Sequence, residues 1–501
     1  MTLPFKACAC LTASLVLAVA GQVFAQTPPG GQAPPAQAQA PPPSGTTTKQ
    51  PDQVKEKPED ARATKRQPRT SKRQPSSSTG RESSAEARVS RNGGPVRQEL
   101  TLRANVQGGY DDNVTGGLGT GAGTLPTAMT SGATAYANAT LSYFLGNARN
   151  SVRMGSTGSL TAYPGNLDEP APGGVVDIAA STMAGRNATF EVSERVGYEP
   201  FFNVYSPGAS GTPLPPGSAE GVPGAALFER NSLSTDTAAS FEQRWSRWNS
   251  MSLSYAYRTQ EFTDDDYGDY GSHNARATYR RSLATGVRAH VEYGYRRTDY
   301  TDADFAARPT REHRIEGGPE FSKALSRRRQ LTFSLGAGAS HTEAISSTTG
   351  QPYSTWLPTG RANATLTLSP AWTLEGGYWR DSSLLQGVTD EVYTTDNAFV
   401  SSAWLLTDRT SLQLGGMYSN WKTPVASGLS DTFIVYGASL QLQVALTDTL
   451  GVTAGYYYYY QRYSNPGALP EGFPAEYNRN AVRVGLTVRV PLVGAPQRTQ
   501  R

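Results

Sequence analysis

Apolar and polar residues alternate along most of the chain from residue 100 onward. In the segment 287–296, Val, Ala and Tyr alternate with Arg, His, Glu and Gly, and in 482–490 Val and Leu alternate with Arg, Gly and Thr. Because successive side chains of a β-strand point to opposite faces, this pattern predicts strands with one apolar face and one polar or small face. Soluble β-sandwiches show the same alternation, so the period alone leaves the architecture open.

The connections between the predicted strands alternate between short and long. The short ones lie at 145–149, 245–249, 369–371, 406–409 and 446–449. The strand after a short turn commonly ends in aromatic residues and then a loop, as at Tyr255–Tyr257 before Asp264 and at Tyr378 and Trp379 before Asp381. Short turns at one end, long loops at the other and aromatic residues at the rim are typical of outer-membrane barrels. The sequence therefore predicts an all-β protein, a transmembrane antiparallel up-and-down β-barrel.

The number of predicted strands is about 18. An even number places both ends of the barrel on the same side, which we predict to be the periplasm. Three segments, near 180, 194 and 317, contain Gly, Pro or charges on both faces, so 16 strands is the alternative. The predicted strand centres lie near 104, 139, 156, 180, 194, 238, 254, 276, 291, 317, 335, 364, 376, 401, 414, 440, 454 and 486.

The first 25 residues are predicted to be a secretory signal peptide. Lys6 precedes an apolar stretch, and Val23-Phe24-Ala25 has the small-residue spacing of a cleavage site. The apolar stretch is shorter than the roughly 20 residues that a spanning helix needs. Both cysteines, Cys8 and Cys10, lie in this segment, so cleavage after Ala25 leaves a mature chain without thiols.

Residues 26–98 form a segment of different composition. A Pro/Gln/Ala-rich part is followed by Lys-, Arg- and Ser-rich sequence that cannot bury enough apolar surface to fold, so we predict a disordered periplasmic arm. The arm is either a solvated spacer or a basic tether that attracts an anionic periplasmic surface such as peptidoglycan. The predicted organisation is signal peptide 1–25, arm 26–98, barrel 99–492 and periplasmic tail 493–501.

The overall composition excludes a helical membrane protein. Hydrophobic residues make up 37% of the chain, the mean hydropathy is -0.48, and outside the signal segment no stretch approaches about 18 consecutive apolar residues. The 51 Gly and 26 Tyr favour turns, strands and interfacial aromatics instead.

The polar face of the predicted strands carries both charge signs and several aromatic residues. A barrel of 16 to 18 strands is wide enough to hold an aqueous channel, so we expect these side chains to line a lumen. The alternative is that the charges pair across the wall and fill the interior. The candidate lumen residues are Arg103, Arg153, Arg276, Arg288, Glu292, Glu375, Trp379, Gln441, Gln443, Tyr457, Tyr459, Arg483 and Arg489.

No spacing of residues predicts catalysis, a metal site or a cofactor. The four histidines, His273, His290, His313 and His341, are spread over separate segments without a metal-ligand motif. In the run Tyr456–Tyr460, alternate rings are expected at the lipid interface, while Tyr457 and Tyr459 point into the lumen. Lumen rings offer sugars a stacking surface, although packing against the loops explains them equally well.

The segment Gly108–Val114 (GGYDDNV) follows the first predicted strand. It resembles the opening segment of outer-membrane barrels that accompany exopolysaccharide and capsule export systems. This resemblance extends, in the alternation of short and long loops, over roughly residues 100 to 492. It implies a conduit of about 18 strands for a secreted polymer. The sequence departs from the usual pattern of outer-membrane barrels at its C-terminus, because it continues to Arg501 beyond the last predicted strand instead of ending in an aromatic residue.

Three functions remain open from the sequence. The first is a channel for export of a polysaccharide, the second is a general or solute-specific diffusion porin, and the third is a barrel enzyme or adhesin. The expected partners are outer-membrane lipid and lipopolysaccharide, the barrel-assembly machinery, and either a periplasmic polysaccharide-export protein or peptidoglycan at the basic arm. Nucleic acid is not an expected partner, because the signal peptide directs the basic arm away from the cytoplasm.

Overall fold

The computed structural model describes eleven stretches of the chain. These are residues 96–113, 131–147, 149–164, 170–203, 227–262, 269–300, 309–345, 351–384, 392–423, 432–464 and 475–494. The predictions for the signal peptide, for nearly all of the arm and for most of the C-terminal tail lie outside these residues.

Every regular element in these stretches is a β-strand. The strands are β1 (Arg97–Asp111), β2 (Gly132–Gly146), β3 (Asn150–Ala162), β4 (Ala171–Ala184), β5 (Ala188–Asn203), β6 (Leu227–Arg244), β7 (Asn249–Phe262), β8 (Tyr270–Ala284), β9 (Val287–Tyr300), β10 (Thr310–Ala324), β11 (Gln330–Ile345), β12 (Pro352–Ser369), β13 (Trp372–Leu384), β14 (Val392–Thr407), β15 (Thr410–Lys422), β16 (Thr432–Ala445), β17 (Leu450–Tyr463) and β18 (Glu476–Val493).

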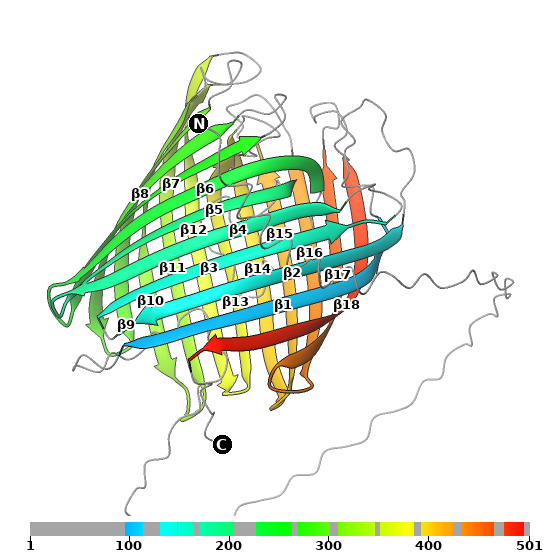
Figure 1. The fold of residues 1–501 in the computed structure, drawn as a ribbon. Helices are drawn as coiled ribbons and strands as arrows, with labels where there is room; N and C mark the ends of the chain where they lie inside the picture. Colours follow the sequence, from blue (N-terminus) through cyan, green and yellow to red (C-terminus); the bar gives the residue numbers. More distant parts are fainter. Residues whose placement is uncertain are drawn as a thin grey trace, which may run out of the picture.

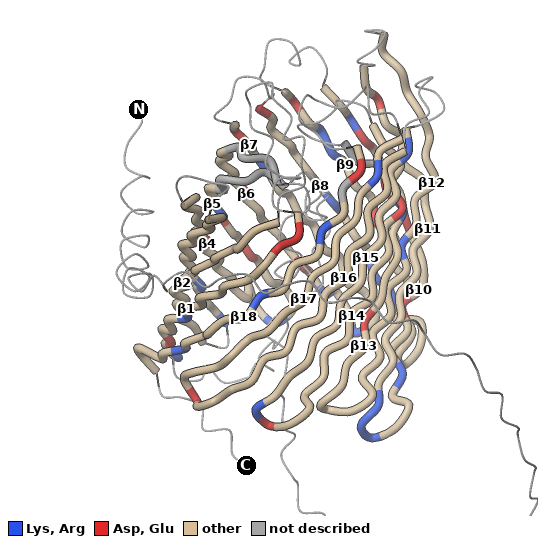
Figure 2. Tube along the Cα trace, turned by 90° about the vertical axis from the view of Figure 1, so that its right-hand side faces the viewer, with Lys and Arg blue, Asp and Glu red and all other residues tan. Residues whose placement is uncertain are grey.

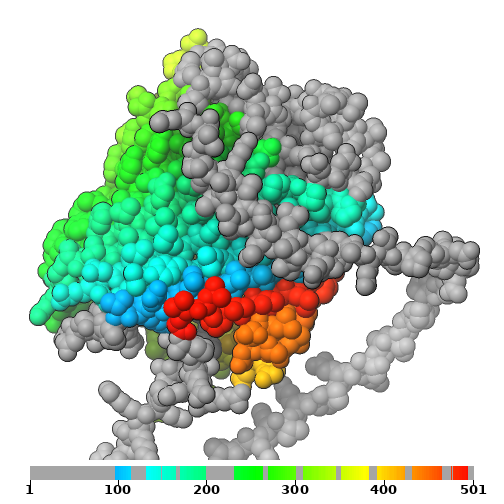
Figure 3. Space-filling view, viewed as in Figure 1, coloured from blue at the N-terminus to red at the C-terminus, as the bar shows by residue number. Residues whose placement is uncertain are grey.

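The strands form a single closed antiparallel barrel (Figure 1). Each strand pairs with its neighbours in sequence, and β1 pairs with both β2 and β18. Figure 3 shows the first strand, in blue, lying directly against the last, in red. Each of the 18 predicted strand centres falls inside the corresponding strand, so the predicted fold and strand number are confirmed and the alternative of 16 is wrong.

The strand predicted near 317 has an irregular centre. In β10 the residues Gly318 and Pro319 interrupt the regular pairing with β11, which holds up to Gly317 and resumes at Glu320. A Cβ atom built on Gly318 would lie 2.1 Å from the carbonyl oxygen of Leu335, so only glycine permits the close approach of the two backbones there. This local packing accounts for the weak alternation in the sequence.

The short turns share one construction. In six of them the side-chain oxygen of an Asn, Ser or Thr accepts the backbone N–H of the second residue after it, and in four of these also that of the third. The turns between β4 and β5 and between β8 and β9 instead place Gly185 and Gly286 at positive φ. The six acceptor oxygens of these turns belong to Asn147, Ser246, Ser326, Ser369, Thr407 and Thr447.

Contacts between strands that are not neighbours identify the inner face of the barrel. Arg314 on β10 donates to Asp381 on β13, and the hydroxyls of Tyr393 on β14 and Tyr463 on β17 lie 3.3 Å apart. Such contacts reach over the intervening strands and form only on the concave side of the wall. We call this side the lumen face and the opposite side the outer face.

The pairing register between neighbouring strands assigns each strand residue to one of these two faces. The lumen face takes the odd-numbered residues of β1, β3 to β5 and β12 to β18, and the even-numbered residues of the other strands. Most large apolar side chains that are exposed lie on the outer face, including Val291, Ile315, Val400, Val484 and Leu486. In the described part of the chain, no helix is long and apolar enough to cross a membrane.

Candidate functional site

The structure places all 13 candidate lumen residues on the lumen face. They are Arg153 on β3, Arg276 on β8, Arg288 and Glu292 on β9, Glu375 and Trp379 on β13, Gln441 and Gln443 on β16, Tyr457 and Tyr459 on β17, and Arg103, Arg483 and Arg489 at the junction of β1 and β18. They do not form one cluster. The lumen face instead has three regions of different chemistry.

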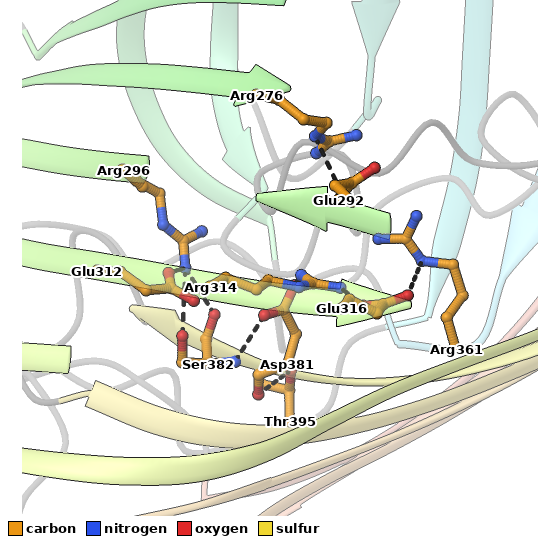
Figure 4. A network of polar contacts seen from close by, with 10 residues as sticks. All are labelled: Arg276, Glu292, Arg296, Glu312, Arg314, Glu316, Arg361, Asp381, Ser382 and Thr395. Carbon is orange, nitrogen blue, oxygen red and sulfur yellow. Dashed lines mark hydrogen bonds and ion pairs between the residues drawn. The ribbon is translucent and has the colours of Figure 1, made fainter. Parts of the chain in front are cut away.

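The first region is a charged wall on β8 to β13, where most charges are paired. Arg276 lies 3.3 Å from Glu292, and Glu292 also accepts a hydrogen bond from Thr278. Arg296 pairs with Glu312 on the neighbouring strand and donates to the carbonyl oxygen of Ser382 at 2.8 Å. Figure 4 shows the side chains of Arg296 and Glu312 meeting Ser382 from another strand. Pairing of this kind is the alternative that the sequence left open for the lumen charges.

Arg314 is the central residue of the charged wall. Its guanidinium pairs with Glu316 on its own strand and with Asp381 on β13, 2.7 Å away (Figure 4). Arg361 approaches Glu316 from β12 at 3.9 Å. The Arg314–Asp381 contact therefore passes over β11 and β12. Both carboxylates that pair with Arg314, those of Glu316 and Asp381, are nearly inaccessible to solvent.

Sequence reasoning missed part of this network. Asp381 was expected at the start of a loop, but it lies within β13, so that prediction was wrong. Glu312 and Arg314 were not singled out because β10 has charges on both faces, and Arg296 because Arg297 follows it on the other face of β9. The sequence did contain a signal for them. Like Glu316, these three residues occupy even positions of β9 and β10 and therefore share its face.

The second region is aromatic and covers the lumen face of β13 to β17. Trp379 packs against Phe399 at a centroid distance of 5.9 Å, and Tyr459 donates to Gln461. Tyr457, Tyr459 and Trp379 are only 6%, 2% and 8% exposed, so their rings are covered rather than offered to solvent. The other aromatic residues of this region are Tyr393, Trp421, Phe433 and Tyr463.

The third region, on β1 to β7, consists largely of small polar side chains. Thr140 and Thr157 form a cross-strand hydrogen bond of 3.0 Å there, and Arg258 pairs with Asp236. Along the junction of β1 and β18, Arg103 lies directly opposite Arg489, and both side chains are exposed.

The histidines divide between the two faces. His290 is on the lumen face, 3.3 Å from Glu320, whereas His273 and His313 lie on the outer face and contact Tyr255 and Tyr293. Within the residues that the structure describes, no three His, Cys, Asp or Glu side chains are grouped so that they could hold a metal ion.

The segment Asp111–Asn113 of the GGYDDNV motif joins the first strand to the last. Asp111 pairs with Arg479, whose Nε lies 2.6 Å from the carboxylate, and both side chains are buried. Asp112 accepts hydrogen bonds from the backbone and side-chain nitrogens of Asn480. Asn113 donates to the carbonyl oxygen of residue 478. We call these contacts the seam clasp.

Comparisons with known proteins give structural likeness alone. No protein-family model matches the chain, and no curated protein does. The FrpB iron transporter from Neisseria meningitidis is 8% identical with a TM-score of 0.42, over 78% of this chain and 82% of that one. Pseudomonas aeruginosa OpdL is 11% identical with a TM-score of 0.40, over 79% and 99%. Pseudomonas aeruginosa OccK11 (OpdR) is 12% identical with a TM-score of 0.38, over 79% and 96%. The likeness concerns the β-barrel fold.

Proposed function

We propose that the protein is an outer-membrane channel that lets polar solutes cross through its lumen. The observation that carries this proposal is the division of one closed barrel into an apolar outer face and a polar lumen face. A closed barrel leaves no unpaired strand edge, which is the condition for a β-sheet in a bilayer. The short-turn end, where β1 begins and β18 ends, then faces the periplasm.

Two neighbouring residues of β18 test the membrane placement. Leu486 is on the outer face and Thr487 is on the lumen face. We expect Leu486→Arg to lower the free energy of unfolding by about 2–4 kcal/mol near the bilayer midplane, because the guanidinium must enter lipid, and Thr487→Arg to be tolerated. Folded fractions across a urea series, read from gel mobility without heating, measure this. Equal effects of the two substitutions would contradict the proposed faces.

A second pair of neighbours tests passage through the lumen. On β3, Thr157 is on the lumen face and Ser156 on the outer face. Since both native cysteines lie within residues 1–25, Thr157→Cys and Ser156→Cys each introduce a single thiol into the processed protein. In planar bilayers we expect a weakly ion-selective current, since both charge signs line the lumen. A charged thiol reagent should reduce this current in Thr157→Cys alone.

The unsubstituted protein is the control for that recording. A protein that gives no current, or a reagent that acts equally on both cysteine variants, would count against a channel through the lumen. The reagent has to reach Thr157 through water, so the comparison separates an aqueous lumen from a filled one.

Export of a polysaccharide is the second candidate function. The observation that favours it is the aromatic region beside Gln441 and Gln443, because rings and amides together suit sugars. Tyr457, Tyr459 and Trp379 are buried, which counts against rings that are already accessible for sugars to stack on. Under this function, soluble polysaccharide fragments block the current and deletion of the gene removes a surface polysaccharide. If small solutes interrupt the current and polysaccharide fragments do not, the diffusion porin is the function that remains.

A further inference from the structure

The short-turn end of the barrel carries a basic and apolar patch on one side. We call it the turn-end patch. It covers the ends of β6 to β11, where three successive short connections lie next to one another. Its ten members, all exposed, are Trp245, Arg247, Trp248, Arg281, Leu283, Lys323, Leu325, Arg327, Arg328 and Arg329.

The two outer turns of the patch, β6–β7 and β10–β11, have backbones fixed by hydrogen bonds to a serine hydroxyl. In the β6–β7 turn, the Ser246 hydroxyl accepts the N–H groups of Trp248 and Asn249. In the β10–β11 turn, the Ser326 hydroxyl accepts those of Arg328 and Arg329. The hydroxyls of Ser246 and Ser326 therefore bind backbone N–H groups within the turns, and the arginine side chains of these turns are exposed.

Charge is distributed unevenly around this end of the barrel. The patch has six cations, namely Arg247, Arg281, Lys323, Arg327, Arg328 and Arg329. The carboxylate of Glu242, near the end of β6, is already paired with Arg244. The other described short turns carry Arg149, Arg186 and Arg409 together with two aspartates. Figure 2 shows the blue of Lys and Arg concentrated at the lower edge of the barrel below β10.

The patch also exposes large apolar side chains next to its cations. Trp245, Trp248, Leu283 and Leu325 are 58%, 44%, 59% and 50% exposed, and the Arg247 guanidinium stacks over the Trp248 ring at 4.8 Å. Exposed apolar residues continue from there up the outer face of the same strands. A surface for a soluble partner would be separate from the apolar wall of the barrel, whereas this one is continuous with it.

We propose that the turn-end patch binds the headgroups of anionic phospholipids in the inner leaflet of the outer membrane. The proposal rests on the membrane placement given above and goes beyond the channel function. Arginines match phosphate oxygens in charge and geometry, and tryptophans favour the boundary between lipid chains and water. The patch would then hold phosphatidylglycerol or cardiolipin against one side of the barrel.

Native mass spectrometry of the full-length protein in detergent tests this, with phosphatidylglycerol as the probe and phosphatidylethanolamine as the zwitterionic reference. We expect Arg247→Gln/Arg327→Gln/Arg329→Gln to weaken phosphatidylglycerol binding by about tenfold or more, since each cation near an anionic surface contributes severalfold. The matched control is Arg149→Gln/Arg186→Gln/Arg409→Gln, which removes three arginines from other turns at the same end. The control should bind phosphatidylglycerol as the unsubstituted protein does.

A second measurement needs no substitution. Brominated phosphatidylglycerol in vesicles should quench tryptophan fluorescence more strongly than brominated phosphatidylethanolamine at the same mole fraction, and the patch variant should lose that difference. Equal loss of lipid in both triple variants, or stronger retention of lipopolysaccharide than of phosphatidylglycerol, would overturn the proposal. Single-channel current should be the same in both variants, so failure here is distinguishable from failure of the channel function.

Discussion

Replacing Arg314 with Met is expected to lower the free energy of unfolding by about 3–5 kcal/mol, because it removes the counter-charge of buried Asp381 and leaves Glu316 with only the more distant Arg361. Glu316 and Asp381 both depend on this guanidinium, and both are almost fully buried. The methionine fills much of the arginine's volume, so the loss reports charge rather than packing. Urea titration of the refolded barrel, with gel mobility as the readout, measures it.

The control for Arg314 is an arginine in an exposed pair. Arg244→Met removes the partner of Glu242 at the end of β6, where the arginine side chain is 70% exposed, and we expect no measurable change. In a Glu316→Gln/Asp381→Asn background, Arg314→Met should cost much less than in the native protein. An equal cost in both backgrounds would show that the arginine acts through packing alone.

The second large effect is expected at the seam clasp. Asp111→Asn should lower the free energy of unfolding by about 3–5 kcal/mol, since Arg479 is then buried without its carboxylate between the first and last strands. The form of the protein that migrates fast on gels without heating should disappear at a lower temperature. Because the substituted side chain has nearly the same shape, the strand pairing itself is not blocked.

Glu99→Gln on the same strand is the matched comparison. Glu99 pairs with Arg97 at an exposed position, so we expect the heating transition to stay where it is. Combining Asp111→Asn with Arg479→Gln removes both charges and should recover part of the lost stability. A double variant as unstable as the single one would falsify the ion pair as the stabilising element.

Strand number, the positions of strands and the assignment of faces were predictable because they depend on local chemistry. The alternation in 482–490 sets which side chains of β18 share a face, and it holds wherever that strand sits in the barrel. Polar turn residues such as Thr407 and Thr447 fix the hairpins through hydrogen bonds to residues two or three positions away. The turns at Gly185 and Gly286 were not recognised, because a glycine alone gives a weaker signal.

The contacts of the lumen could not be predicted because they depend on the curvature of the whole wall. Arg314 and Asp381 are 67 residues apart on strands that do not pair, so no period in the sequence relates them. The lumen parity of Trp379 followed from the sequence, but its burial against Phe399 and its other neighbours did not. An odd or even position in a strand determines the face to which a side chain points, whereas the cross-section of the barrel determines which residues it contacts.

Closure between β1 and β18 means that the chain can become a barrel only after its last strand has been synthesised and inserted. The partners in the seam clasp, Asp111 and Arg479, are separated by 368 residues. A polypeptide that is cut short before β18 would keep β1 and its own final strand as two unpaired edges, which are templates for aggregation. Closure at the seam therefore depends on the complete set of strands, and we expect truncated copies to be degraded instead of forming barrels.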